Sequence, residues 1–364
     1  MKQHRSIYGL WQSVGLNRQL WLLLALVGAL GVSQVGYAED CVQCATNAVP
    51  DPPVSTGEWL LTKQVNEVNV LFVAAHKGKV VGDLSRNDIS VRDDNKQPAA
   101  ILGFRTERDL PLRVGVAIDT SSSLTSRFRF EQAAASAFFR QAVRDGDLGF
   151  VMGFENYPTV TQDFVGDPDL LSQGVGRLTI GGGTALYDAV RTACQKLLHR
   201  PEQDMVARVL VVLSDGQNNA GEVSLEGAID AAQEAEVTIY AVSTNYQYPT
   251  LFREGDSAAD QGNSNLRRLA EQTGGRLLRP SSPKDVANAF VKIGEELRSR
   301  YAVSYKPADF TPDGRYRKIK IEARKTGTKL EVRARKGYRA RLASSLSSDF
   351  PESDSPEQVH ASLR

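Results

Sequence analysis

The sequence predicts an α/β fold in which a doubly wound, mainly parallel sheet is flanked by small β units. Two observations indicate this fold. In the middle of the chain, nearly continuous apolar runs alternate with segments of helical periodicity, as they do in βαβ units. On both sides of this region, shorter runs alternate apolar and polar residues and are separated by turn sequences, which is typical of antiparallel strands.

Length and composition indicate a globular protein. The chain has 364 residues, of which 41% are hydrophobic and 24% are charged, so about two domains are expected. This composition excludes collagen-like, fully disordered and polytopic membrane proteins. The net charge of +1 does not favour nucleic-acid binding. Three cysteines are too few for a disulfide scaffold or a four-cysteine zinc site.

Residues 1–38 are predicted to be a secretory signal peptide. The basic residues Lys2, Arg5 and Arg18 precede an apolar run, Leu20–Val32, and the small residues Gly36 and Ala38 follow it, so cleavage is expected after Ala38. A retained membrane anchor is the alternative, but a spanning helix needs about 20 apolar residues and this run is shorter. The protein is therefore expected to be periplasmic or secreted, with no membrane span after cleavage.

Residues 39–57 are predicted to be a linker that contains Cys41 and Cys44. In an oxidising compartment these thiols can close a small loop or bridge to a partner. A thiol–disulfide enzyme is an alternative function, but an attacking thiolate needs a stabilising helix N-terminus and prolines follow here instead. Cys194 falls on the apolar face of a predicted helix and is expected to be a buried core residue.

Residues 58–109 are predicted to form a small β unit, with turns at 76–79 and 93–96 and a helical turn or tight bend at 84–89. By itself this unit indicates no chemistry.

Residues 301–342 are predicted to form a basic segment of β strands, and residues 343–364 a disordered tail rich in Ser, Pro and acids. Residues 301–341 contain thirteen Lys or Arg residues and four acidic residues. Such a segment can attract nucleic acid, but for an exported chain a solvated sheet face or contact with an anionic envelope surface is favoured.

Residues 110–300 contain the alternating strands and helices. Strands are expected at Leu112–Ile118, Leu148–Phe154, Ala207–Leu213 and Val237–Val242, and helices at Phe130–Val143, Ala185–Leu198, Leu225–Glu234, Leu266–Gln272 and Asp285–Leu297. In such sheets, ligands bind outside the carboxyl ends of the strands. The loops that follow these strands are therefore the candidate functional sites.

The loop after the first of these strands offers several oxygens in one turn. Asp119, Ser121 and Ser123 alternate along it, and Mg²⁺ takes oxygen ligands that include one or two carboxylates. A polar cap between strand and helix is the alternative, because Asp and Ser also favour that position.

Two more loops favour the metal site. Thr184 follows three glycines and precedes a predicted helix, and Asp215-Gly216 follows the strand that begins at Ala207. Because the ends of neighbouring parallel strands lie side by side, Asp119 and Asp215 can share one ion, with the glycine loop folded over them.

These three loops resemble the von Willebrand factor type A domain with a metal-ion-dependent adhesion site. The resemblance covers roughly residues 112–300 and implies a Rossmann-like fold. It also implies that Mg²⁺ or Mn²⁺ keeps one coordination position open for an acidic side chain of a protein partner. The five positions of the family's motif correspond here to Asp119, Ser121, Ser123, Thr184 and Asp215. The sequence departs from the family at Gln217-Asn218-Asn219, where a further acid is common. The flanks are similar to those of a bacterial secreted subgroup.

Other chemistries fit the sequence less well. The glycine loop lacks the lysine of a P-loop, and no histidine falls at a strand end beside the serines, as Ser-His-Asp hydrolysis would need. The sequence therefore indicates an exported, metal-dependent protein-binding module rather than an enzyme. An accessory subunit that assembles, or inserts metal into, an envelope complex remains an alternative.

Overall fold

The structure, a computed structural model, describes residues 67–106, 110–122, 128–202, 205–246 and 257–340. All of these belong to one structural unit, Lys63–Arg364. The predicted signal peptide, the linker with Cys41 and Cys44, and the predicted C-terminal tail lie outside the described residues. Ser123 lies outside them too. In the part of the chain that is described, no helix is long and apolar enough to cross a membrane.

A six-stranded sheet forms the centre of the α/β region. In spatial order its strands are β10 (Leu277–Leu278), β9 (Thr238–Ser243), β8 (Ala207–Ser214), β5 (Leu112–Asp119), β6 (Leu148–Phe154) and β7 (Pro158–Val165). Neighbouring strands are parallel except for β7, which is antiparallel to β6. Every residue of β5 is buried, as in a strand covered on both faces, which explains its continuous apolar run.

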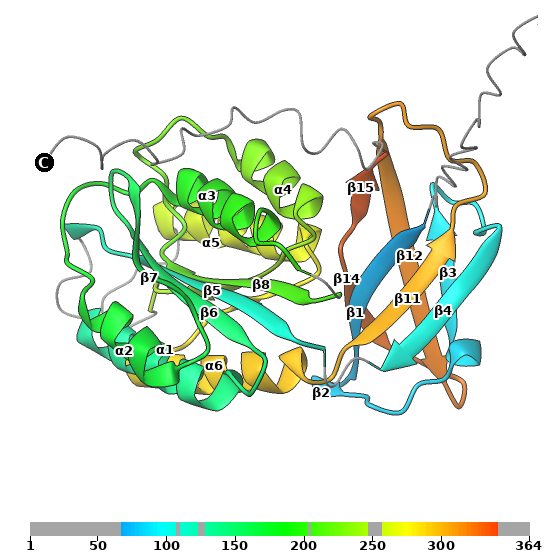
Figure 1. Ribbon diagram of the computed structural model, residues 1–364, viewed down its shortest axis with the longest axis horizontal. Helices are drawn as coiled ribbons and strands as arrows, with labels where there is room; N and C mark the ends of the chain where they lie inside the picture. Colours follow the sequence, from blue (N-terminus) through cyan, green and yellow to red (C-terminus); the bar gives the residue numbers. More distant parts are fainter. Residues whose placement is uncertain (1–66, 107–109, 123–127, 203–204, 247–256, 341–364) are drawn as a thin grey trace, which may run out of the picture. The chain divides into compact units, whose positions relative to one another are not determined.

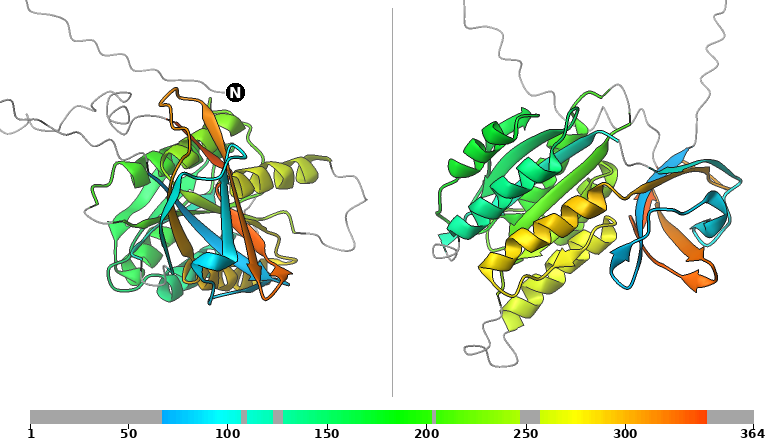
Figure 2. Two further views of the ribbon diagram at one scale, coloured as in Figure 1. Left: turned by 90° about the vertical axis from the view of Figure 1, so that its right-hand side faces the viewer. Right: turned by 90° about the horizontal axis from the view of Figure 1, so that it is seen from below.

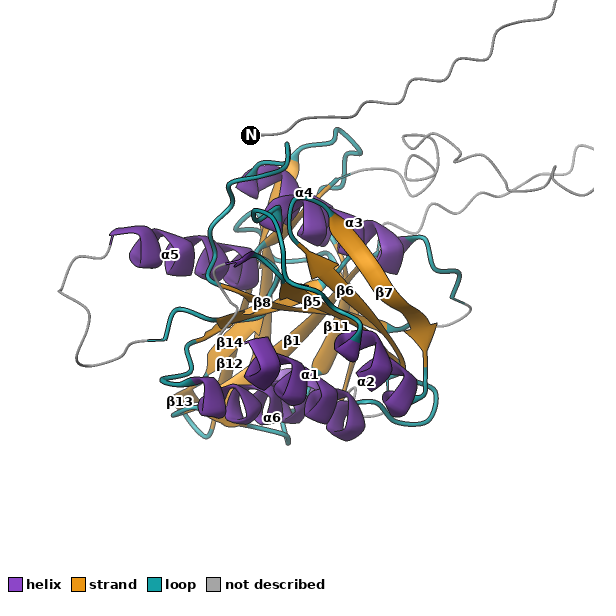
Figure 3. Cartoon of the chain, turned by 90° about the vertical axis from the view of Figure 1, so that its left-hand side faces the viewer, coloured by secondary structure: helices purple, strands orange, loops and turns teal. Residues whose placement is uncertain are grey.

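Helices cover both faces of this sheet (Figures 1 and 3). One face is covered by α1 (Phe128–Ala142), α2 (Pro168–Gly176) and α6 (Val286–Leu297), and the other by α3 (Leu186–Leu198), α4 (Leu225–Glu234) and α5 (Ser257–Gln272). The predicted doubly wound, mainly parallel sheet is thus confirmed. Cys194 lies fully buried in the core between the sheet and helices α3, α4 and α5, as expected, and burial raises the pKa of its thiol.

The predicted strands and helices of this region all appear, most of them within two residues of the expected ends. The exception is α5, which begins at Ser257 rather than near Leu266. Two longer elements of the region were not predicted: strand β7 and helix α2.

The segments on either side of the α/β region pair with each other in two antiparallel sheets (Figures 1 and 2). The first sheet contains β14 (Glu331–Ala334), β1 (Val68–His76), β11 (Tyr301–Lys306), β4 (Ala100–Thr106) and β2 (Lys79–Val80). The second contains β13 (Thr328–Lys329), β12 (Tyr316–Lys325), β15 (Gly337–Arg339) and β3 (Ile89–Asp93). Apolar side chains of both sheets share one core, so the two flanks make one β domain. The expected helical turn between β2 and β3 is the 3₁₀ helix Arg86–Asp88.

The α/β domain is inserted into this β domain. It occupies the chain between β4 and β11, and these two strands are antiparallel neighbours. Their register begins where Thr106 pairs with Tyr301, so the chain leaves the β domain and returns to it at the same pair of residues. The α/β domain therefore connects two antiparallel neighbouring strands, in the position that the loop has in a β-hairpin.

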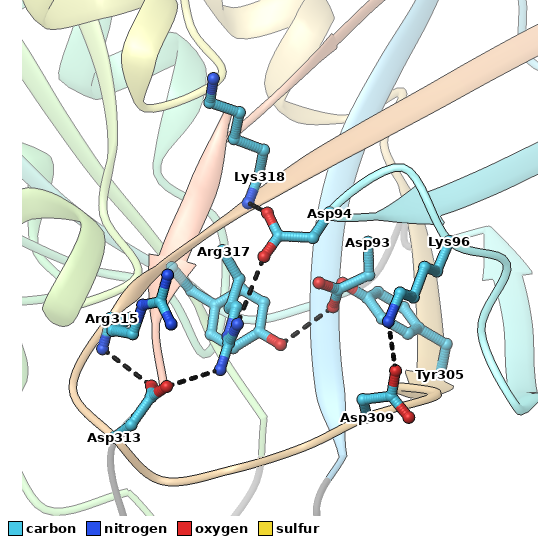
Figure 4. Close-up of polar contacts among 10 residues, drawn as sticks. Asp93, Asp94, Lys96, Tyr305, Asp309, Asp313, Arg315, Arg317 and Lys318 are labelled. Carbon is cyan, nitrogen blue, oxygen red and sulfur yellow. Dashed lines mark hydrogen bonds and ion pairs between the residues drawn. The ribbon is translucent and has the colours of Figure 1, made fainter.

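A buried carboxylate ties the β domain together (Figure 4). Asp93, the last residue of β3, is only 7% exposed and accepts hydrogen bonds from the hydroxyls of Tyr305 and Tyr338, each 2.9 Å long. Burial raises the pKa of both tyrosines, and the negative charge of Asp93 raises it further. This contact joins one N-terminal strand to two C-terminal strands.

Basic residues of the C-terminal strands make ion pairs with acids of the α/β domain. Three such pairs are Arg333 with Glu296 at 3.0 Å, Arg335 with Glu236 at 3.0 Å, and Arg339 with Asp230 at 2.6 Å. Part of the local basic excess in residues 301–341 therefore serves contacts within the protein.

Candidate functional site

The predicted site lies at the carboxyl ends of β5 and β8. Asp119 is the last residue of β5, and Asp215 follows the last residue of β8. These strands are parallel neighbours, with Ile118 paired to Leu213, so the two loops that follow them begin side by side. The negative charge of Asp215 contributes to raising the pKa of Asp119, as expected for carboxylates at the ends of neighbouring strands.

Asp119 is completely buried and is held by neutral donors. The Ser121 amide donates to its Oδ1 over 3.0 Å, and the Ser214 hydroxyl donates to its Oδ2 over 2.8 Å. The oxygen of that same hydroxyl accepts a 3.0 Å bond from the Gly216 amide. Ser214, which is not among the predicted site residues, thus links the first loop to the third.

Burial raises the pKa of Asp119 to about 6, although hydrogen bonds from Ser121 and Ser214 oppose the shift and Asp215 adds to it. The hydrogen bonds alone therefore do not offset the free energy needed to bury an ionised carboxylate at this position. A cation beside it would lower that cost, and the neighbouring oxygens of Ser121 and Asp215 are suited to hold one.

The glycine-rich loop is fixed to the loops around it. The Gly181 amide donates to the Thr120 carbonyl, and the Gly183 amide donates to Asn156 Oδ1, each over 2.9 Å. Gly182 has a φ of +57°, and a β-carbon there would lie 2.6 Å from the Asn156 side chain. Glycine is thus required where the turn after β6 packs against this loop.

The polar residues that depart from the family's motif hold the start of α3. Asn219 Oδ1 accepts a 2.7 Å bond from the Thr184 amide, and Asn218 Oδ1 accepts a 3.1 Å bond from the Tyr187 amide. The residue at the N-cap of α3, Ala185, has no side chain that can accept such bonds. Asn218 therefore caps this helix from the third loop, and Asn219 positions the backbone of Thr184, which precedes the N-cap residue.

The Asp215 loop is packed tightly against α5. Gly216 has a φ of +81°, and a β-carbon at that residue would lie 2.1 Å from the Gly262 carbonyl oxygen. The side-chain Nδ2 of Asn245 donates to the Asp215 carbonyl over 2.7 Å, and the side-chain Nδ2 of Asn265 donates to the Gly216 carbonyl over 3.2 Å. The third loop is thereby held from both the β9 end and the helix.

The donor set fits a hard divalent cation. Among the described residues there is no group of three or more His, Cys, Asp or Glu side chains placed to hold a metal. A site here would therefore combine the carboxylates of Asp119 and Asp215 with hydroxyl oxygens, a set that suits Mg²⁺ or Mn²⁺ and not zinc. The structure brings the loops of Asp119, Ser121, Thr184 and Asp215 together.

A glutamate that the sequence analysis did not place near the site lies beside it. Glu155 follows β6, and a β-carbon on Gly181 would lie 2.5 Å from its Oε2. The Glu155 carbonyl also accepts a 2.6 Å bond from the Ala185 amide. A signal for this residue exists in the sequence, because it too follows a buried parallel strand.

Comparison with known proteins identifies the domain that carries these loops. The sequence profile of the von Willebrand factor type A domain matches residues 114–290. The chain contains a von Willebrand factor type A domain. This domain accounts for the inserted α/β region, and no curated protein sequence matches the chain as a whole or in part.

Solved structures of type A domains are similar to this one at low sequence identity. An aerotolerance-related membrane protein from Bacteroides fragilis is 17% identical, with a TM-score of 0.39 over 50% of this chain and 98% of that one. The vWF domain of the type V pili tip protein Mfa5 from Porphyromonas gingivalis is 16% identical, with a TM-score of 0.41 over 52% and 95%. A von Willebrand factor type A protein from Catenulispora acidiphila is 13% identical, with a TM-score of 0.42 over 73% and 78%.

Proposed function

We propose that this protein is an exported protein-binding module whose type A domain depends on a divalent metal. Mg²⁺ or Mn²⁺ would be held by Asp119, Ser121, Ser123, Thr184 and Asp215. The observation that carries the proposal is the buried Asp119 carboxylate, which has only neutral donors among its hydrogen bonds and lies beside a second carboxylate. The bound ion supplies positive charge that attracts a carboxylate of a partner protein.

The charges around the site make such binding conditional on the metal. The described segments 119–122, 155–157, 181–185 and 215–223 contain four acids and no Lys or Arg. Without an ion this edge of the domain repels an acidic side chain, because like charges are destabilising at short range. A divalent ion among mostly neutral hydroxyl ligands reverses the sign of the local field.

We propose binding rather than catalysis for this edge. The two carboxylates are both assigned to the ion, and the same described segments contain no histidine to act as a general base. Glu155 is the remaining acid closest to the glycine loop, and its side chain lies against the backbone of that loop. Its part in the proposal is to shape the loop.

The first test measures the metal and the carboxylate separately. Mg²⁺ is titrated by calorimetry into the native protein and into Asp119→Ala, and only the native protein is expected to bind. Peptide libraries with one fixed Asp, or with Asn at that position, are then offered in Mg²⁺ and in chelator. Binding is expected only for the Asp library in Mg²⁺. Binding that survives chelator, Thr184→Ala and Asp215→Ala would refute the proposal.

The destination and the alternatives rest on the predicted leader and linker. An exported location follows from the predicted signal peptide at residues 1–38. If the protein were instead a thiol–disulfide enzyme, replacing Cys41 and Cys44 by Ser would abolish its activity and leave Mg²⁺ binding intact. An accessory subunit for assembly or metal insertion would retain its partner in Mg²⁺ but release it once the complex is complete.

A further inference from the structure

An exposed aromatic side chain stands beside the proposed metal edge. Tyr157 lies in the turn between β6 and β7 and is 77% exposed, the largest exposure among the large hydrophobic residues of the described chain. A tyrosine in water leaves a large apolar surface unburied. Such a residue contributes little to folding, and tyrosine is one of the residue types that most often carry the binding energy of a protein interface.

The turn that carries Tyr157 is fixed to the glycine loop. Asn156 receives a bond from the Gly183 amide, and Glu155 receives one from the Ala185 amide. Gly183 and Ala185, which donate these bonds, are the residues on either side of Thr184. Tyr157 therefore directly follows a residue that is bonded to the loop of this proposed metal ligand. The Glu155 amide also donates to the Tyr157 carbonyl over 3.4 Å, which closes the turn.

The rest of this edge is polar. Ser122, Asn156, Gln217, Asn219 and Glu222 are exposed side chains of its described loops, and none offers a large apolar surface. The edge therefore combines one proposed carboxylate-binding ion with one aromatic surface among polar side chains. Neutral amides tolerate many partners, whereas an exposed ring distinguishes an apolar neighbour from a polar one.

We infer that Tyr157 selects the partner of this domain. The partner is a protein segment in which an apolar side chain lies next to the acidic residue that reaches the ion. This inference rests on the proposed function, because the ion sets where the acid lies. It adds the second contact of the recognition, a Tyr157 ring packed against an aliphatic or aromatic side chain.

The test uses peptide libraries that share one fixed Asp and differ in the residues on both sides of it: Leu, Ser or Lys. In Mg²⁺ the native protein is expected to bind the Leu library about tenfold more tightly than the Ser library. This is the affinity ratio expected when one leucine side chain is partly buried against the ring. Tyr157→Ala is expected to remove this preference and to keep Mg²⁺-dependent binding of the Ser library. Tyr157→Phe is expected to keep the preference.

A matched control is Leu102→Ala, which removes another exposed apolar side chain, 53% exposed, from strand β4 of the β domain. The preference is expected to survive it. The outcomes separate the two proposals. Loss of Mg²⁺-dependent binding to every library overturns the proposed function. Mg²⁺-dependent binding without a preference, a preference for Lys, or a preference that survives Tyr157→Ala overturns the role of Tyr157 alone.

Discussion

Two buried aspartates, each the last residue of a strand, are used differently in the two domains. Asp93 receives two hydroxyls from tyrosines in β11 and β15, so its partners belong to regular strands of the β domain. Asp119 receives a backbone amide and the Ser214 hydroxyl at the edge where three loops meet, and a second carboxylate lies near it. Burial of a carboxylate therefore does not by itself indicate a functional site. What distinguishes Asp119 from Asp93 is that its hydrogen-bond partners lie in loops at a sheet edge and not in regular strands.

The largest expected effect is on the β domain. Asp93→Ala leaves two buried tyrosine hydroxyls without their acceptor, and we expect a loss of about 3–5 kcal/mol in the free energy of unfolding. Urea unfolding measures it in Mg²⁺ and in chelator, and the loss should be equal in both. Tyr305→Phe and Tyr338→Phe each remove one donor and should cost less. A loss that Mg²⁺ restores would show that Asp93 is not a structural residue.

Metal removal should separate the two aspartates. With free Mg²⁺ at one hundred times its dissociation constant, the native protein should gain about 2.7 kcal/mol of stability over the chelated protein. Asp119→Asn should lose this gain, whereas Asp93→Ala should keep it. Thermal unfolding with and without chelator provides the measurement. An unchanged midpoint for the native protein would contradict the metal site.

Acidity should affect the chelated protein through Asp119. The pKa of its folded carboxyl, about 6, lies above the unfolded value of about 3.9, so folding favours the protonated form. This contribution is fully present below about pH 4 and is lost as the pH rises to about 6, an expected change of roughly 2 kcal/mol.

The measurement is the difference in unfolding free energy between the native protein and Asp119→Asn across this pH range in chelator. Subtracting the variant removes the titration of all other acids. In saturating Mg²⁺ the trend should reverse, because the ion requires the ionised carboxylate. A flat difference in chelator would mean that burial does not disfavour the charge.

The smallest effect concerns the asparagine that holds the loop before α3. Asn219→Ala removes the acceptor of the Thr184 amide and should cost about 1 kcal/mol of stability. It should also weaken Mg²⁺ binding roughly tenfold, since Thr184 loses its support. Asn219→Asp keeps an acceptor oxygen and should retain most of the stability and most of the Mg²⁺ affinity. Equal metal affinity in all three proteins would show that this hydrogen bond does not support the metal site.

Strands β5, β6, β8 and β9 of the type A domain could be predicted because they are almost wholly buried and read as continuous apolar runs. β7 lies at the sheet edge and none of its residues is fully buried, so its sequence lacks that signal. The pairing of β1 with β11 and β14 could not be predicted from the sequence, because strands so distant along the chain leave no local pattern that identifies them as partners.

The candidate site was predictable to a similar degree. Its carboxylates and hydroxyls follow strands that the sequence reveals, so their meeting at one sheet edge follows from the topology. The supporting residues Ser214, Asn156 and Asn219 could not be recognised. Each acts through a hydrogen bond between loops, and such bonds depend on how the loops pack rather than on spacing along the chain.

The insertion of the type A domain has a consequence for the time course of folding. During synthesis β1 to β4 appear first, and apart from the short pairing of β1 with β2 they have no partner strand until β11 follows a whole domain later. Closing so long a loop by random search is slow, and unpaired strand edges meanwhile invite association with other chains. A type A domain that folds first holds its two ends near each other. We therefore expect its folding to set the rate at which the β domain is completed, so that mutations slowing the inner domain leave the outer one open to misassembly.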